Sequence, residues 1–115
     1  MRILFVEDNV NTAHAMKVLL ELRGFHVDTA KTVAEALGAI ASNGYDIMIS
    51  DINLPDGTGY DILSRSPKPI RAIALSGYTS AADREESLLK GFAEFIAKPF
   101  KNEELIAAIE RVRGN

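Results

Sequence analysis

The sequence contains no cysteine, and it has only 4 prolines and 8 glycines among 115 residues. The absence of cysteine excludes disulfide bonds, thiolate zinc sites and cysteine nucleophiles, and it fits a reducing compartment. Low proline and glycine, together with 47% hydrophobic and 25% charged residues, exclude a disordered or collagen-like chain. We therefore expect a globular protein.

Long hydrophobic runs and clusters of positive charge are also missing. No apolar run approaches the ~20 residues of a bilayer span, and the apolar stretch at 3–6 is shorter than the ~7 to 15 residues of a signal-peptide core. The 13 basic and 16 acidic residues give a net charge of -3, and the basic residues are scattered. We expect a soluble, cytoplasmic protein that contacts neither membrane nor nucleic acid directly. His14 and His26 have no ligand-like company, which predicts surface positions.

The length fits one domain covering residues 1–115, and two kinds of hydrophobic periodicity alternate along it. Short runs rich in branched residues predict five strands. Segments with helical spacing lie between and after them, including a helix behind Thr32, where Glu35 completes a capping-box pattern. The predicted strands cover 3–6, 25–28, 47–49, 70–75 and 95–97, and the other helices cover 11–23, a short segment from Tyr60 to before Pro67, 80–90 and 102–113. This alternation predicts a doubly wound α/β domain with a mostly parallel sheet and helices on both faces.

Polar residues follow four of the predicted strands. Ligand chemistry in doubly wound sheets belongs at the carboxyl ends of the strands, so these side chains should meet in one crevice. They are Glu7 and Asp8, then Asp51, Ser76 and Lys98.

Three carboxylates in one crevice repel one another and call for a cation, and oxygen ligands suit magnesium. Lys98 would pair with an anion beside the metal, Ser76 would bond another of its oxygens, and Asp51 would be free to attack phosphorus. Each element alone also has an ordinary structural interpretation: an acid after a strand is often a cap or a turn former. Lys98-Pro99 could simply end a strand, although a proline there also raises the chance of a cis bond that aims the lysine.

Four stretches of the sequence resemble the receiver domain of two-component response regulators, and the resemblance runs along the whole chain. It implies a flavodoxin-like (βα)5 fold with strand order 2-1-3-4-5. The stretches are ILFVEDN at 3–9, DIMISDINLPDG at 46–57, ALSGY at 74–78 and FIAKPF at 95–100.

The same resemblance assigns roles to individual residues. It implies that Asp51 is the phosphoacceptor and a metal ligand, that Asp8 binds the metal directly and that Glu7 binds it through water. Asn53 matches the position whose backbone carbonyl completes the metal shell. The remaining matches are Ser76, the switch hydroxyl, Lys98, which contacts the phosphoryl group, and Phe95, the aromatic switch position.

Three departures from the commonest family pattern are modest. Glu7 stands where many members have aspartate, and Ser76 stands where many have threonine; both should preserve the chemistry. Phe95 lacks the hydroxyl of a tyrosine, which removes a hydrogen bond that could stabilise its inward rotamer.

The resemblance further implies a phosphorelay receiver that uses Mg2+ or Mn2+. Its partners would be a histidine kinase or a histidine phosphotransfer protein, and a downstream effector or second copy could bind the face made by the fourth helix, fifth strand and fifth helix. It would be a signalling module that catalyses only its own phosphorylation and dephosphorylation. Tyr78 and Asn53 would flank the approach of the hydrolytic water.

Two other functions compete with this one. A haloacid dehalogenase-like magnesium phosphatase also uses a strand-end aspartate, but it normally has a second acid two residues later, where this chain has Asn53. A flavodoxin-like domain that binds a partner without phosphate would lack the acidic pair or Lys98. Because the predicted fifth helix ends the chain, we expect a free-standing receiver or one excised from a hybrid histidine kinase.

Overall fold

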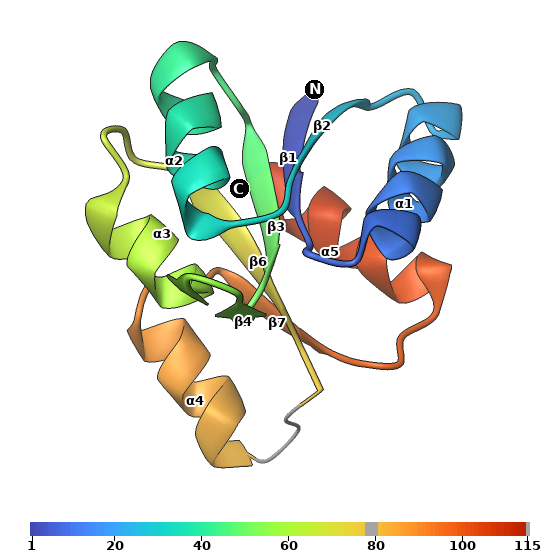
Figure 1. The fold of residues 1–115 in the computed structure, drawn as a ribbon. Helices are drawn as coiled ribbons and strands as arrows, with labels where there is room; N and C mark the ends of the chain where they lie inside the picture. The colour runs from blue at the N-terminus through green and yellow to red at the C-terminus, as the bar shows by residue number, and fades with distance from the viewer. Residues whose placement is uncertain (78–80, 115) are drawn as a thin grey trace.

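A five-stranded parallel sheet forms the centre of the computed structural model, which describes residues 1–77 and 81–114 (Figure 1). The strand order is β2-β1-β3-β6-β7. Because β6 and β7 are the fourth and fifth strands of this sheet, the predicted flavodoxin-like order 2-1-3-4-5 is confirmed. The strands are β1 (Arg2–Val6), β2 (His26–Ala30), β3 (Ile47–Asp51), β6 (Arg71–Ser76) and β7 (Glu94–Ala97).

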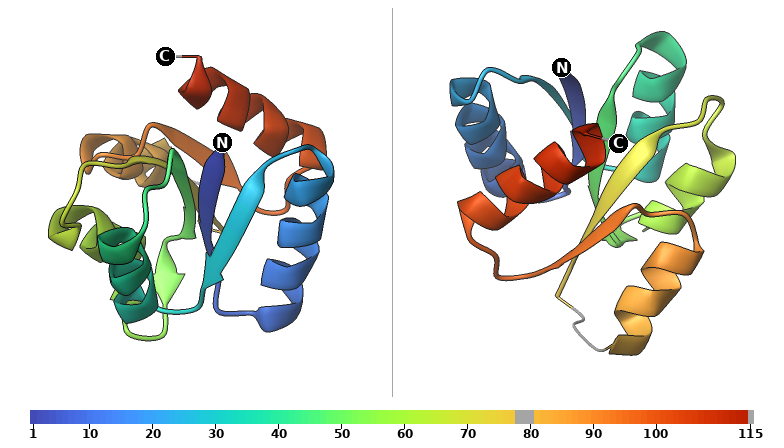
Figure 2. Two further views of the ribbon diagram at one scale, coloured as in Figure 1. Left: turned by 90° about the horizontal axis from the view of Figure 1, so that it is seen from above. Right: turned by 180° about the vertical axis from the view of Figure 1, so that it is seen from behind.

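Five helices cover the two faces of the sheet (Figures 1 and 2). Helices α1 (Val10–Leu22) and α5 (Asn102–Arg113) pack on one face, and α2 (Val33–Ser42), α3 (Gly59–Arg65) and α4 (Ala81–Leu89) lie on the other. Among the described residues, no helix is long and apolar enough to cross a membrane.

Alternate residues of each strand point to opposite faces, and both faces are covered. Ile3 and Phe5 of β1 belong to the core beneath α1 and α5, whereas Leu4 and Val6 belong to the core beneath α2 and α3. All five residues of β3 are buried, which is typical of a strand that is covered by helices on both faces of a parallel sheet.

Helix starts follow local capping chemistry. The hydroxyl of Thr32 accepts a hydrogen bond from the amide of Glu35, which confirms the predicted start of α2. Thr58 caps α3 in the same way, and the Asp61 carboxylate returns a bond to the Thr58 amide. The second cap was not predicted, because an aspartate replaces the usual glutamate of the capping box.

The segment after Asp51, to which the sequence assigned neither strand nor helix, forms a short hairpin. Strands β4 (Asn53–Leu54) and β5 (Gly57–Thr58) form an antiparallel hairpin. Strands of two residues are too short to show any periodicity, so the sequence did not reveal this hairpin. At the tip, the Asp56 carboxylate accepts bonds from the amides of Val33 (2.7 Å) and Ala34 (3.1 Å) and so caps α2 from outside.

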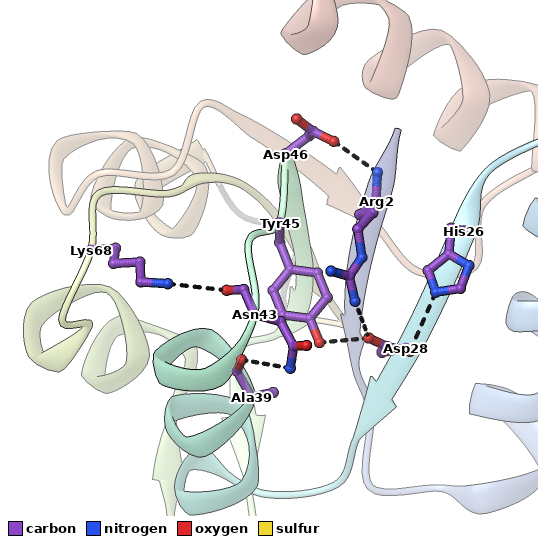
Figure 3. Close-up of polar contacts among 8 residues, drawn as sticks. All are labelled: Arg2, His26, Asp28, Ala39, Asn43, Tyr45, Asp46 and Lys68. Carbon is purple, nitrogen blue, oxygen red and sulfur yellow. Dashed lines mark hydrogen bonds and ion pairs between the residues drawn. The ribbon is translucent and has the colours of Figure 1, made fainter.

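A polar cluster joins the amino ends of β1, β2 and β3 (Figure 3). Asp28 Oδ2 accepts a 2.7 Å hydrogen bond from the Tyr45 hydroxyl and lies 3.3 Å from the Arg2 guanidinium, which stacks on the Tyr45 ring. Burial and this bond raise the pKa of Tyr45 to about 12, and the same bond lowers the pKa of Asp28. His26, exposed as predicted, lies 4.0 Å from Asp28. The cluster occupies the edge of the sheet opposite the predicted site.

Candidate functional site

The register of the sheet brings the predicted site residues to one edge. Val6 lies beside Ser50 in the neighbouring strand, so the next residues, Glu7 and Asp51, emerge side by side. Ser76 ends β6 and pairs with Ala97, and Lys98 follows directly. The carboxyl ends of β1, β3, β6 and β7 therefore lie next to one another at the place where the sequence predicted the site (Figure 1).

Three carboxylates meet in this crevice. Glu7, Asp8 and Asp51 each place an oxygen within 4.8 Å of the others. Glu7 and Asp51 are only 4% and 6% exposed, whereas Asp8 is open to solvent. The amide of Asn9 donates to Glu7 Oε2 at 3.2 Å and fixes that side chain. Carboxylate oxygens that converge from a buried and an exposed side form a donor set suited to a hard divalent cation that keeps part of its water shell.

Lys98 supplies the positive charge of the site. Its ammonium group contacts Asp51 Oδ1 and lies 3.4 Å from Glu7 Oε1. Burial by itself would lower the pKa of Lys98, but the hydrogen bonds and the attraction to Asp51 and Glu7 raise it above its ordinary value. The lysine is therefore a permanent cation at neutral pH. The three carboxylates still outnumber it, which leaves an excess of negative charge for a metal ion to neutralise.

A small pocket opens beside the acidic cluster. It has a volume of about 100 Å3, and Asp51, Ser76 and Lys98 line it together with Asn53 and the backbone around them. Water occupies about 30 Å3 per molecule in the liquid, so the pocket suits a group of a few heavy atoms. The carboxylate, the hydroxyl and the ammonium group thus face one shared space, as the sequence predicted.

Phe95 is already buried in this structure. Only 7% of the residue is exposed, and it packs in the core beneath α2 and α3. Little additional surface is left for Phe95 to bury by rotating inward. Its role as an aromatic switch stays a prediction.

Two further residues support Asp51 and were not predicted. The buried hydroxyl of Ser50 donates to the backbone carbonyl of Asp51 at 2.8 Å. A Cβ atom at Gly59 would lie 2.9 Å from that same carbonyl, and the Gly59 amide donates to the Ile52 carbonyl at 2.8 Å. A glycine in the first turn of a helix has no special pattern in sequence, so this close approach shows only in three dimensions.

Two predicted site residues, Asn53 and Tyr78, remain to be placed. Asn53 is exposed at the start of β4, two residues after Asp51, and lines the pocket. Tyr78, predicted to flank the path of the hydrolytic water, lies outside the described residues.

A flavodoxin-like sheet with an acidic cluster, a lysine and a hydroxyl at the carboxyl ends of its strands defines a signalling receiver fold. Comparison with known proteins agrees, since the family model of the response regulator receiver domain matches residues 3–110. The chain belongs to this family.

Relatives and solved structures support the same assignment. The transcriptional regulatory protein KdpE of Mycobacterium tuberculosis is 34% identical over 98% of this chain, which covers 51% of KdpE. The chain therefore spans about half the length of the curated relatives that it matches. The non-phosphorylated HemR receiver domain from Leptospira biflexa superposes with a TM-score of 0.86 at 35% identity, covering 96% of this chain and 92% of HemR. The response regulator TrrA from Thermotoga maritima, solved in complex with Mg(2+)-BeF, has a TM-score of 0.83 at 29% identity, with 96% and 97% of the two chains covered.

Proposed function

We propose that this domain accepts a phosphoryl group on Asp51 from a histidine kinase or a histidine phosphotransfer protein, in a magnesium-dependent reaction. One observation carries the proposal: Asp51 belongs to the acidic cluster, contacts Lys98 and borders a pocket of the size of a phosphoryl group. The finding that TrrA holds Mg(2+)-BeF supports the same chemistry for a similar fold.

In the transfer step, a carboxylate oxygen of Asp51 forms a bond to phosphorus while the phosphorus–nitrogen bond of the phosphohistidine breaks. The electron pair of that bond stays on the imidazole nitrogen. Lys98 neutralises negative charge on the transferring oxygens, and Ser76 donates a hydrogen bond to one of them. Catalysis therefore depends on positioning and electrostatics.

Asp8, Asp51 and the backbone carbonyl of Asn53 would hold Mg2+, or Mn2+ in its place, and Glu7 would act through a bound water molecule. The metal supplies positive charge that screens the carboxylates from the incoming phosphate.

Phosphorylation adds about -1.5 to -2 charges and three acceptor oxygens at Asp51. Ser76 and the backbone after it would be drawn toward that group, which changes the face formed by α4, β7 and α5. A downstream effector or a second copy of the chain would bind this face in one of the two states.

Phosphorylation is tested by incubating the protein with Mg2+ and acetyl phosphate and measuring its intact mass. We expect the mass of one added phosphoryl group, absent in Asp51→Asn and absent when the metal is chelated. Asp46→Asn is the matched control, because Asp46 lies at the opposite end of β3, where it accepts a bond from the Arg2 amide. Uptake of phosphate by Asp51→Asn would refute the assignment.

Turnover distinguishes the domain from a phosphatase. A haloacid dehalogenase-like enzyme would release many equivalents of alcohol from a phosphate ester, whereas a receiver becomes phosphorylated once. Asn53 stands where such an enzyme normally has its acid, and its side chain cannot donate a proton to a leaving group.

A domain that binds partners without phosphate would show no change in stability on titration with magnesium.

A further inference from the structure

Helix α4 is anchored to the protein in an unusual way. Of its nine residues, only Ser87 is buried, and this residue is polar and fully enclosed. The two leucines at its end, Leu88 and Leu89, are 44% and 80% exposed. Apolar burial, which holds most helices to a protein, therefore contributes little to the position of α4.

The partner of Ser87 is a tyrosine from the neighbouring helix. The hydroxyl groups of Tyr60 and Ser87 lie 2.9 Å apart and form a hydrogen bond. Lys90 places its ammonium group 4.6 Å from the centre of the Tyr60 ring, and the edge of the Phe92 ring meets the same ring. We call the contact of Tyr60 with Ser87 and Lys90 the α3–α4 latch.

One side of the latch is tied to the phosphoacceptor strand. Tyr60 is the second residue of α3, and the residue before it, Gly59, packs against the carbonyl of Asp51 and bonds to Ile52. The start of α3, from which Tyr60 projects, is therefore held against the backbone at Asp51 and Ile52.

The other side of the latch is tied to the switch hydroxyl. Ser76 ends β6, and α4 begins only five residues later at Ala81. A groove of about 550 Å3 separates α3 from α4, and Ser76, Phe95, Tyr60 and Ser87 all line it. Ser76 and the latch residues thus border one groove, so a displacement of Ser76 toward a phosphoryl group on Asp51 would change the packing beside the latch.

We propose that the α3–α4 latch holds α4 in its unphosphorylated position and so opposes the conformational change that follows phosphorylation. The inference rests on the proposed phosphorylation of Asp51, and it adds a contact that determines how readily the conformational change follows phosphorylation. Hydrogen bonds weaken steeply when the two atoms move apart, so a shift of α4 relative to α3 breaks the contact. The free energy of the latch is then lost from the phosphorylated state alone, and removing the latch favours that state.

The test measures the affinity for fluoroberyllate, a mimic of the phosphoryl group, in the presence of Mg2+. The variants are Tyr60→Phe and Ser87→Ala, which each remove one hydroxyl, and the double variant. The net stabilisation by one hydrogen bond in a protein changes an equilibrium constant by a factor of about 2 to 10. We therefore expect each single variant to bind the mimic about 2- to 10-fold more tightly than the wild type. The double variant should bind no more tightly than the singles, because both changes remove one bond.

Tyr45→Phe is the matched control. It also removes a tyrosine hydroxyl with a hydrogen bond, to Asp28, but at the opposite edge of the sheet. We expect it to leave the affinity for the mimic unchanged. If Tyr60→Phe and Ser87→Ala bind the mimic as the wild type does, or more weakly, the latch has no inhibitory role.

Amide hydrogen exchange without any mimic tests the restraint itself. Exchange in residues 84–90 should be faster in Tyr60→Phe than in the wild type, and equal rates would overturn the inference. Failure of the two proposals can be distinguished. If the wild type neither binds the mimic nor becomes phosphorylated, the proposed function fails and the regulatory role of the latch fails with it, whereas normal binding with unresponsive variants refutes only the latch.

Discussion

Replacing Lys98 by methionine tests the electrostatic organisation of the site. The substitution keeps the length of the side chain but removes the ammonium group that contacts Asp51 and lies 3.4 Å from Glu7. At that distance two unit charges attract by about 5 kcal/mol at an effective dielectric of ~20. The Lys98 side chain is 35% exposed, so solvent screening reduces the contribution of this attraction to the free energy of unfolding to about 1–2 kcal/mol. The two carboxylates that remain are almost fully buried, which is why the loss should exceed that of a surface ion pair.

The assay is urea unfolding at pH 7 without divalent metal. We expect Lys98→Met to lower the free energy of unfolding by about 1–2 kcal/mol, whereas Lys31→Met, which changes an exposed lysine, stays within about 0.5 kcal/mol of the wild type. A variant as stable as the wild type would show that Lys98 does not compensate the buried carboxylates.

The pH dependence of this difference has a definite sign. The pKa of Lys98 is raised in the folded protein, so its stabilisation is fully present below the unfolded value of about 10.4. It is lost as the pH rises through the still higher pKa of the folded state. The gap between wild type and Lys98→Met should therefore stay constant from neutral pH to about pH 9 and close above the unfolded pKa. A gap that closes between pH 7 and 9 would contradict the assignment of a raised pKa.

Three other perturbations have defined outcomes. Gly59→Ala should lower the free energy of unfolding by about 1–3 kcal/mol, because its Cβ would lie 2.9 Å from the Asp51 carbonyl oxygen. Gly38→Ala, at an open helical position, should leave the stability unchanged or raise it by up to about 1 kcal/mol. Equal effects of the two substitutions would refute the steric argument. Asp56→Ala should lower the free energy of unfolding, because it removes the bonds that cap α2. Since the bonds to Val33 and Ala34 lower the pKa of Asp56 in the folded protein, this stabilisation should be present above the unfolded aspartate pKa and be lost as the pH falls through the folded pKa. If the stability of the variant falls with acid pH in the same way as that of the wild type, the capping role of Asp56 is contradicted. Magnesium should raise the melting temperature, and Asp8→Asn should reduce that shift; an undiminished shift would exclude Asp8 as a ligand.

The parallel sheet with helices on both faces could be predicted because strand and helix periodicities alternate along the chain, whereas the order of the strands was predicted only from the family resemblance. The residues of β3 are all apolar or become buried, and the helix behind Thr32 combines a cap with an apolar face. The hairpin at 53–58 could not be predicted, because its strands of two residues are held by the capping bonds of Asp56 and Thr58 and by no hydrophobic pattern.

The charged part of the site could be predicted from topology alone. Once parallel strands are assigned, Asp51 and Lys98 must meet at one edge, whatever their separation in sequence. The supporting contacts could not be predicted. The Ser50 hydroxyl and Gly59 act on a backbone carbonyl, and Tyr60 finds Ser87 only after two helices have packed.

Glu7 and Lys98, which touch across the site, are 91 positions apart in the chain. During synthesis, the first of them leaves the ribosome long before the second exists. The cluster of Glu7, Asp51 and Lys98 therefore cannot be completed until β7, the last strand, has joined the sheet. A chain that ends before β7 lacks Lys98, so its buried carboxylates would have no positive partner and the site would stay incomplete.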